Sequence, residues 1–267
     1  MILRHAREQF GGQPVENCFE AIDERSGNML GSCTIYVQEN ENLFPGRPVR
    51  IYIEIDGNPA PDALLGAAVA RAKEIAAAYR KPARIFTQVE PDDEVCLAAL
   101  AALGFRDSDG LVDMQRKLPY VHGVNLPAGC VTVIDDLDDP LEQEYFLERY
   151  NHLFGEENDL EWLQEMRSHK EFKRILIVAP TGMVGETIIW HEGKKGVISW
   201  LHTARKWRRM GVAHALLDLA CKEFTRCDMD YASAEIQVRI PNLLKVMEAA
   251  DFIQTRLIMR YPGIDWN

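Results

Sequence analysis

The chain has 267 residues and a mass of 30.4 kDa, which corresponds to one large or two small domains; 47% of the residues are apolar and 27% charged, as in average globular proteins. This composition excludes disordered, collagen-like and low-complexity classes, and no apolar run approaches the ~18 residues of a membrane span. The net charge of −11 argues against a nucleic-acid partner. The six cysteines lie far apart with no CxxC pair and no signal peptide is recognised, so we expect no metal site, no disulfide framework and a cytoplasmic location.

The first half of the chain alternates predicted strands and helices. The segment VRIYIEI at 49–55 has the period-2 alternation of a strand, and an alanine-rich helix is predicted directly after it. In chain order, the sequence predicts strands near 16–23, 29–38 and 49–55, a helix over 62–79, a strand at 85–89, a helix over 93–103 and a last strand at 111–118.

A segment rich in proline and glycine, PYVHGVNLPAG at 119–129, separates this half from the second. We therefore predict a first domain at 1–119, a linker at 120–129 and a second domain at 130–267. In the second half the sequence predicts a strand at 131–134, helices over 140–153 and 159–169, strands at 174–179, 184–190 and 197–203, a helix over 211–224, a strand at 233–238, a helix over 241–250 and a strand at 252–260.

The two halves resemble each other. Ala-Leu-Gly-Phe at 102–105 corresponds to Ala-Ala-Asp-Phe at 249–252, and Arg-Lys-Leu-Pro at 116–119 to Met-Arg-Tyr-Pro at 259–262. A duplicated α+β unit explains these correspondences better than a single large sheet does. The predicted fold class is therefore mixed α+β, in two tandem domains.

The segment VISWLHTARKWRRMGVAHALL at 197–217 is the most informative part of the chain. A predicted strand runs into a loop with four cations in five residues, Arg205–Arg209, and Gly211 then opens an amphipathic helix. The first amides of a helix lack intrahelical partners, and the helix dipole adds positive potential at the same end. Because Gly211 and Ala213 are small, a diphosphate could approach this backbone closely.

Residues Arg208–Ala213 match the R/Q-x-x-G-x-G/A signature of the GNAT N-acetyltransferase superfamily. The resemblance implies domains with a mostly antiparallel central sheet flanked by helices, and two helices that cover the acceptor site. It also implies that the signature loop grips the pyrophosphate of acetyl-CoA, that the preceding strand binds the pantetheine arm, and that Val238 and Asn242 open the family's next helix. The cofactor-binding residues so implied are Leu201, His202, Thr203, Arg208, Arg209, Met210, Gly211, Val212, Ala213, His214 and Asn242. No metal is implied.

This sequence also departs from the family pattern. Arg205 replaces the proline that often precedes the loop, and Asp251-Phe252 replaces Gly-Phe. The tyrosine that protonates the thiolate in many members falls near Met247, which cannot donate a proton. In the first half, the equivalent turn at 56–62 has two aspartates, two prolines and no cation, so we interpret that half as a degenerate copy that serves as a structural partner.

Several groups are candidates for the base that takes the proton of the amine. They are Glu186, His202 and Glu235, with His191 behind them and a water chain equally consistent with the sequence. The competing interpretation of each is a solvated or hydrogen-bonded strand residue. Acidic residues of the two helices at 140–169 would favour a cationic amine beside them.

The predicted function is an acetyl-CoA-dependent N-acetyltransferase that moves an acetyl group to a primary amine of a small molecule or peptide by direct attack. The alternative is a non-catalytic acyl-CoA-binding or regulatory protein derived from an acetyltransferase. Both hypotheses predict binding of CoA, but only the first predicts release of free thiol when an amine is present.

Overall fold

The computed structural model of the chain describes residues 1–9, 11–57 and 62–267. Contacts between residues divide the chain into two compact units, in which each unit draws on separate stretches of the sequence. The first unit contains Met1–Leu111, Leu153–Gly155 and Leu257–Asn267. The second unit contains Val112–His152 and Glu156–Arg256.

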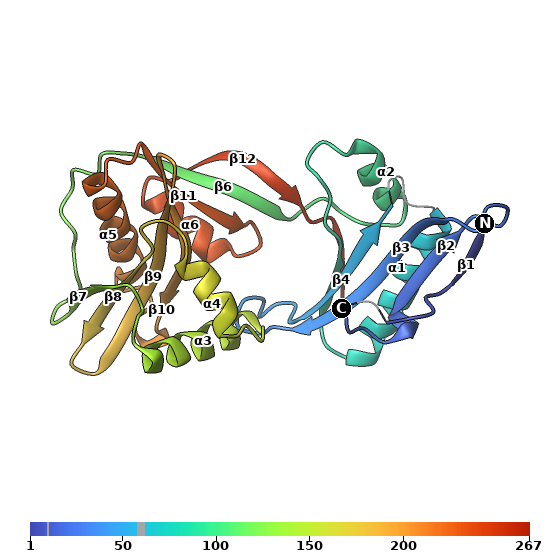
Figure 1. Ribbon diagram of the computed structural model, residues 1–267, viewed down its shortest axis with the longest axis horizontal. Helices are drawn as coiled ribbons and strands as arrows, with labels where there is room; N and C mark the ends of the chain where they lie inside the picture. Colours follow the sequence, from blue (N-terminus) through green and yellow to red (C-terminus); the bar gives the residue numbers. More distant parts are fainter. Residues whose placement is uncertain (10, 58–61) are drawn as a thin grey trace. The chain divides into compact units, whose positions relative to one another are not determined.

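The first unit is built on a six-stranded sheet that is antiparallel except where β4 and β5 pair in parallel (Figure 1). In spatial order its strands are β1 (Ile2–His5), β2 (Cys18–Ile22), β3 (Met29–Glu39), β4 (Val49–Asp56), β5 (Ala83–Phe86) and β13 (Gly263–Trp266). The helices of this part of the chain are a 3-10 turn η1 (Val15–Asn17), α1 (Asp62–Tyr79) and α2 (Glu94–Ala102). The small residues of α1, such as Ala68 and Ala72, are buried against β2–β5, which accounts for its alanine-rich composition.

The second unit is built on a seven-stranded sheet. Its spatial order is β12 (Ile253–Arg260), β6 (Gly110–Lys117), β11 (Tyr231–Gln237), β10 (Lys195–Thr203), β9 (Gly182–Glu192), β8 (Lys173–Ala179) and β7 (Val131–Asp135). The strands from β7 to β10 pair antiparallel, whereas β10 and β11 pair in parallel. The helical elements are α3 (Pro140–Phe154), α4 (Leu160–Arg167), a 3-10 turn η2 (Arg205–Trp207), α5 (Val212–Arg226) and α6 (Pro241–Ala249).

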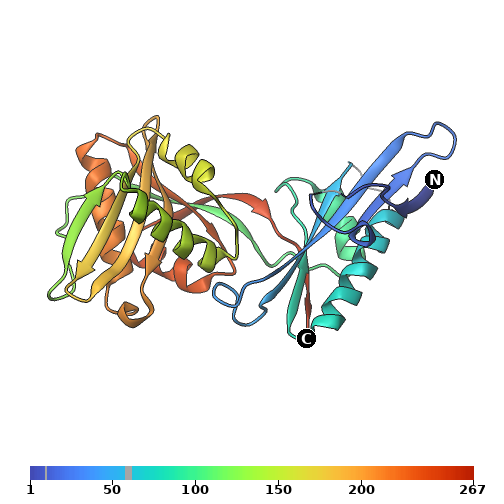
Figure 2. The same ribbon diagram turned by 60° about the horizontal axis from the view of Figure 1, so that its bottom comes forward.

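Helices cover both faces of the second sheet (Figure 2). Helix α5 lies against one face, because a Cβ placed on Gly185 would meet Val212 and Leu216 of α5 and one on Gly196 would meet Phe224. We call this the α5 face. Helix α3 lies against the opposite face, which we call the α3 face.

The last strand of each half of the sequence lies in the sheet formed mainly by the other half. Strand β6 follows the elements of the first half but lies between β11 and β12 in the second sheet, and β13 at the end of the chain pairs with β5 in the first sheet. The division into units therefore differs from the boundaries predicted at 119 and 130, because the chain passes between the units at Leu111–Val112 and at Arg256–Leu257, and on both sides of Leu153–Gly155. The sequence also predicts a single closing strand at 252–260, where the structure has β12 followed by β13.

The predicted fold class is confirmed, since each unit has a mostly antiparallel sheet flanked by helices. Helix α1 has the predicted bounds, and α3 and α4 form the two helices expected between the first two strands of the second half. Within the described ranges, no helix combines the length and the apolar character that a membrane crossing requires.

Candidate active site

Strands β10 and β11 pair only at their beginnings. The parallel ladder joins Lys195–Val197 to Tyr231–Ser233, and no further pairs of these two strands occur among the described residues. Strand β10 continues to Thr203 and β11 to Gln237. The backbone of both strands is therefore available along an opening between them, which we call the slot.

A β-bulge in β10 sets which face its side chains occupy. Ile198 is opposite Ile189 and Trp200 is opposite Ile188 on β9, so Ser199 is an extra residue in β10. Before the bulge, Gly196 and Ile198 lie on the α5 face. After it, Trp200 and His202 lie on the α3 face, and Leu201 and Thr203 on the α5 face.

The loop after β10 has the conformation of an anion cradle. Arg209 and Gly211 both have positive φ, of 64° and 81°, and Gly211 caps the N-terminus of α5. In the described part of the chain, the backbone amides from Arg209 to His214 have no backbone acceptor, while that of Ala215 donates to the Gly211 carbonyl at 2.9 Å. A row of six unbonded amides therefore precedes and opens α5, whose dipole is positive at this end.

The side chains of this loop leave the amides accessible. Arg208, Arg209, Met210 and Gly211 are exposed, and Arg208 Nε donates to the Thr203 carbonyl at 3.5 Å. Of the other residues implied for the cofactor, Leu201, Thr203 and Ala213 are half-buried, Val212 is buried, His214 lies 3.6 Å from the Asp218 carboxylate, and Asn242 is exposed at the second position of α6.

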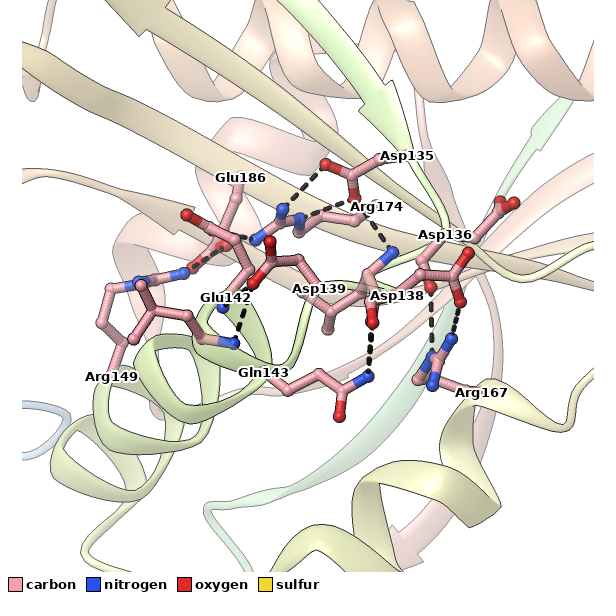
Figure 3. A network of polar contacts seen from close by, with 12 residues as sticks. Asp135, Asp136, Asp138, Asp139, Glu142, Gln143, Arg149, Arg167, Arg174 and Glu186 are labelled. Atoms are coloured by element: carbon pink, nitrogen blue, oxygen red, sulfur yellow. Dashed lines mark hydrogen bonds and ion pairs between the residues drawn. The ribbon is translucent and has the colours of Figure 1, made fainter.

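Glu186 is one of three base candidates on the α3 face, and an arginine holds it. Arg149 of α3 donates from Nε and from a terminal amino group to the two carboxylate oxygens of Glu186, both at 2.9 Å, and Glu186 is 0% exposed (Figure 3). A bidentate pair of this kind fixes both partners. Because both of its oxygens are engaged, Glu186 is poorly placed to accept a proton from a substrate.

A second ion-pair cluster fixes the start of α3. Arg174 of β8, which is buried, donates to Asp135 of β7 at 2.7 and 2.9 Å and to Glu142 of α3 at 2.9 Å (Figure 3). Gln143 donates to the Leu137 carbonyl at 2.8 Å. Helix α3 is thus held to the sheet by two ion pairs, Glu142 with Arg174 in its first turn and Arg149 with Glu186 in its third.

His202 lies directly opposite Glu186 in the β9–β10 ladder and stacks on Trp200, with ring centroids 5.7 Å apart. Its Nδ1 is buried and has no hydrogen-bond partner in the described structure. Burial lowers the pKa of His202 from its usual 6.5; Glu186 raises it in part, and Arg149 and Arg208 lower it further. The imidazole is therefore neutral at physiological pH.

Glu235 and His191 occupy different positions. Glu235 is exposed on β11 and, by alternation from Ser233, lies on the α3 face with His202. His191 lies on the α5 face, where it is buried with its ring 5.8 Å from that of Phe224. The structure thus brings Glu186, His202 and Glu235 to one face and separates His191 from them.

Aromatic side chains of α3 and α4 meet β10 on the α3 face. The Tyr150 ring lies 4.9 Å from Trp200 and 4.7 Å from Trp162, and Phe146 lies 5.9 Å from Trp200. Burial, and then the charge of Glu156, raises the pKa of Tyr150 to about 12, so it remains a neutral phenol. Sequence reasoning missed this cluster; the apolar spacing of Phe146 and Tyr150 on α3 was its only signal.

Met247 of α6 is 1% exposed and belongs to the core. Across the described ranges, no group of three or more His, Cys, Asp or Glu side chains could hold a metal ion. The site therefore consists of a slot between two strands, a cradle of amides at one of its sides, and a face with imidazole, carboxylate and aromatic groups.

Comparison with known proteins agrees with this geometry. Residues 134–244 match the family model of the Acetyltransferase (GNAT) family. The second unit carries a GNAT domain. The matched region of the GNAT domain extends from β7 to the start of α6 and includes the slot, the cradle and the three base candidates.

Solved structures with the same fold cover most of the chain. A GCN5-related N-acetyltransferase from Sphaerobacter thermophilus aligns over 96% of this chain and 82% of its own with 13% identity and a TM-score of 0.55. A tandem GNAT protein from the clavulanic acid biosynthesis pathway aligns over 93% of this chain and 82% of its own, with 16% identity and a TM-score of 0.50. A probable N-acyltransferase from Enterococcus faecalis V583 aligns over 92% of this chain and 61% of its own, with 11% identity and a TM-score of 0.59. At these identities the likeness concerns the fold. No curated protein matches the chain by sequence.

Proposed function

We propose that the protein is an acetyl-CoA-dependent N-acetyltransferase whose GNAT domain binds the cofactor. The observation that carries this proposal is the row of six unbonded amides from Arg209 to His214 at the positive end of α5. Such amides suit a diphosphate, and Arg208 and Arg209 can add charge-assisted contacts. The open backbone of β10 and β11 suits the extended pantetheine arm.

We infer that the acceptor is a primary amine that approaches from the α3 face. Attack requires a neutral amine, so an ammonium acceptor must first lose a proton. His202 takes this proton, the nitrogen forms a C–N bond with the thioester carbonyl carbon and gives a second proton to solvent, and the C–S bond breaks. Because Met247 cannot donate a proton, solvent protonates the leaving thiolate.

The alternative of a non-catalytic CoA-binding protein is favoured by one observation, the apolar Met247 at the position of the usual proton donor. Release of free thiol from acetyl-CoA in the presence of an amine separates the two functions. The first half of the chain is proposed to act as a structural partner; residues 58–61 of its expected non-binding turn lie outside the described residues.

Replacing Arg208 and Arg209 together by alanine is expected to weaken CoA binding. Each arginine can supply a charge-assisted contact of about 1.5–3 kcal/mol to the diphosphate, so affinity should fall by one to several powers of ten, with non-additivity allowed for. Titration calorimetry with CoA measures the change. Arg226→Ala, which removes an exposed arginine at the far end of α5, should leave affinity unchanged. An unchanged affinity in the double variant contradicts the assignment.

Replacing His202 by glutamine is expected to lower kcat by about 10²–10⁴, as removal of a general base does. Because the pKa of His202 is lowered, the wild-type enzyme should keep its base deprotonated down to a pH below 6.5 and lose activity only below that. In His202→Gln, this loss of activity at low pH should disappear from the profile of kcat/KM against pH. The control His169→Gln changes an exposed histidine stacked on Trp190 and should keep the wild-type profile. Loss of activity in Glu235→Gln but not in His202→Gln would assign the base to Glu235 instead.

A further inference from the structure

A pocket of about 300 Å³ opens on the α3 face beside the closed end of the slot. Lys195 and Tyr231, which form the first pair of the β10–β11 ladder, belong to its lining, and they lie on the face opposite Gly196 and α5. The lining side chains all carry hydrogen-bonding groups: Asp113, Gln115, Lys195, Tyr231, Thr255 and Arg256.

Asp113, which carries the single carboxylate of this lining, already accepts several hydrogen bonds from neighbouring side chains. Asp113 is buried and accepts from Ser233 Oγ at 2.5 Å, from Gln115 Nε2 at 2.6 Å and from Thr255 Oγ1 at 3.1 Å, and Arg256 Nε lies 3.8 Å away. A carboxylate so engaged has little capacity left for a cationic guest.

The remaining hydrogen-bonding capacity of the pocket consists mainly of donors. Lys195 Nζ contacts Glu192 at 2.6 Å, which leaves two of its three N–H bonds. Arg256 turns Nε toward Asp113, and in the described structure its two terminal amino groups and the Tyr231 hydroxyl have no hydrogen-bond partner. Two cationic side chains with spare donors suit a carboxylate or a phosphate.

The pocket is close to the opening of the slot. Ser233, which donates to Asp113, is the last residue of β11 paired with β10, and Glu235 is the next residue on the same face. Two residues of strand span about 7 Å. A small amine held in the pocket by one end could therefore place its other end where β10 and β11 separate.

We propose that this pocket binds an anionic group, a carboxylate or a phosphate, of the acceptor, so that the acceptor is a zwitterionic amine. This inference rests on the proposed function. The anionic end contacts Lys195 and Arg256, and the amine end lies toward Glu235 at the opening of the slot. The anionic end of the acceptor thus meets cationic side chains, and its amine end meets a carboxylate.

The test compares matched acceptors in a thiol-release assay with acetyl-CoA. The acid arm pairs amino acids and dipeptides with their carboxamides, and the phosphate arm pairs ethanolamine phosphate with ethanolamine. The wild-type enzyme should show kcat/KM at least tenfold higher for the anionic member of the preferred arm. Lys195→Gln and Arg256→Gln should each remove about tenfold of that preference and leave the carboxamide or alcohol unchanged.

Two variants serve as matched controls. Lys194→Gln and Arg226→Gln remove exposed cations that pair with Asp228 and Glu223 outside the pocket, and both should keep the wild-type preference. CoA affinity is measured in parallel for the wild type and every variant. If none of them binds CoA, including the wild type, the proposed function itself is refuted. With CoA binding intact, equal use of both members of each pair, turnover of no anionic amine, or an unchanged preference in both pocket variants overturns the inference.

Discussion

Replacing Gly211 by valine is expected to weaken CoA binding by more than a hundredfold. A Cβ at Gly211 meets no atom within 4 Å, so a larger side chain projects into open space beside the unbonded amides instead of into the protein. A diphosphate that loses two charge-assisted contacts of about 1.5–3 kcal/mol each loses about two to four powers of ten in affinity. Titration calorimetry measures the affinity of the variant for CoA, and urea unfolding measures its free energy of unfolding separately.

The strain of a positive φ needs its own control, because Gly211 has φ of 81°. Gly193, in the turn between β9 and β10, has φ of 62° and also has no atom within 4 Å of an added Cβ. Gly193→Val should therefore lose stability to a similar extent, about 1–3 kcal/mol, and bind CoA normally. Equal CoA affinities of the two variants would show that Gly211 does not lie against the cofactor.

Replacing Arg149 by methionine is expected to destabilise the protein by about 3–5 kcal/mol, because the fully buried carboxylate of Glu186 then loses both donors. The second variant, Arg149→Met combined with Glu186→Leu, removes both charges and should recover most of this loss. Urea unfolding measures the free energy of unfolding of both. If the double variant is still strongly destabilised, the lost free energy of unfolding comes from the packing of α3 and not from the buried charge.

Arg167 of α4 provides a comparison in which the carboxylate partner is exposed. It forms an ion pair with Asp138, whose side chain is 77% exposed, and it also donates to the Asp136 carbonyl (Figure 3). Arg167→Met should cost about 1–3 kcal/mol, the sum of an ion pair to an exposed carboxylate and two hydrogen bonds, one to the Asp136 carbonyl and one to Gln164. A larger loss in Arg149→Met than in Arg167→Met is expected, because only the first variant leaves a buried carboxylate without its donors.

Local sequence signals were enough to predict the helices and the glycine that opens α5. The alanine-rich composition of residues 62–79 predicted α1, and Gly211 marks the start of α5 because a left-handed cap favours glycine. The position of His202 could not be predicted in the same way. Strict alternation from Gly196 would put His202 on the α5 face, and the extra residue Ser199 in β10 moves it to the other.

Other features depend on contacts between residues far apart in the sequence. Arg149 and Glu186 are separated by 37 positions, and nothing in either segment indicates that they meet. The exchange of β6 and β13 is equally hidden, because β6 has the pattern of a strand that could close its own half and β13 was not predicted as a strand. Strand order is set by tertiary pairing, whereas periodicity reports only that a segment is a strand.

The position of β6 has a consequence for the evolution of the chain. A duplicated domain is usually free to lose, move or replace one copy, since each copy is complete by itself. Here β11, one wall of the proposed cofactor slot, has as its other neighbour a strand encoded before the linker, and Asp113 of that strand bonds to Ser233 of β11. If the proposed function is correct, we expect selection on the slot also to preserve β6, which is encoded before the predicted linker.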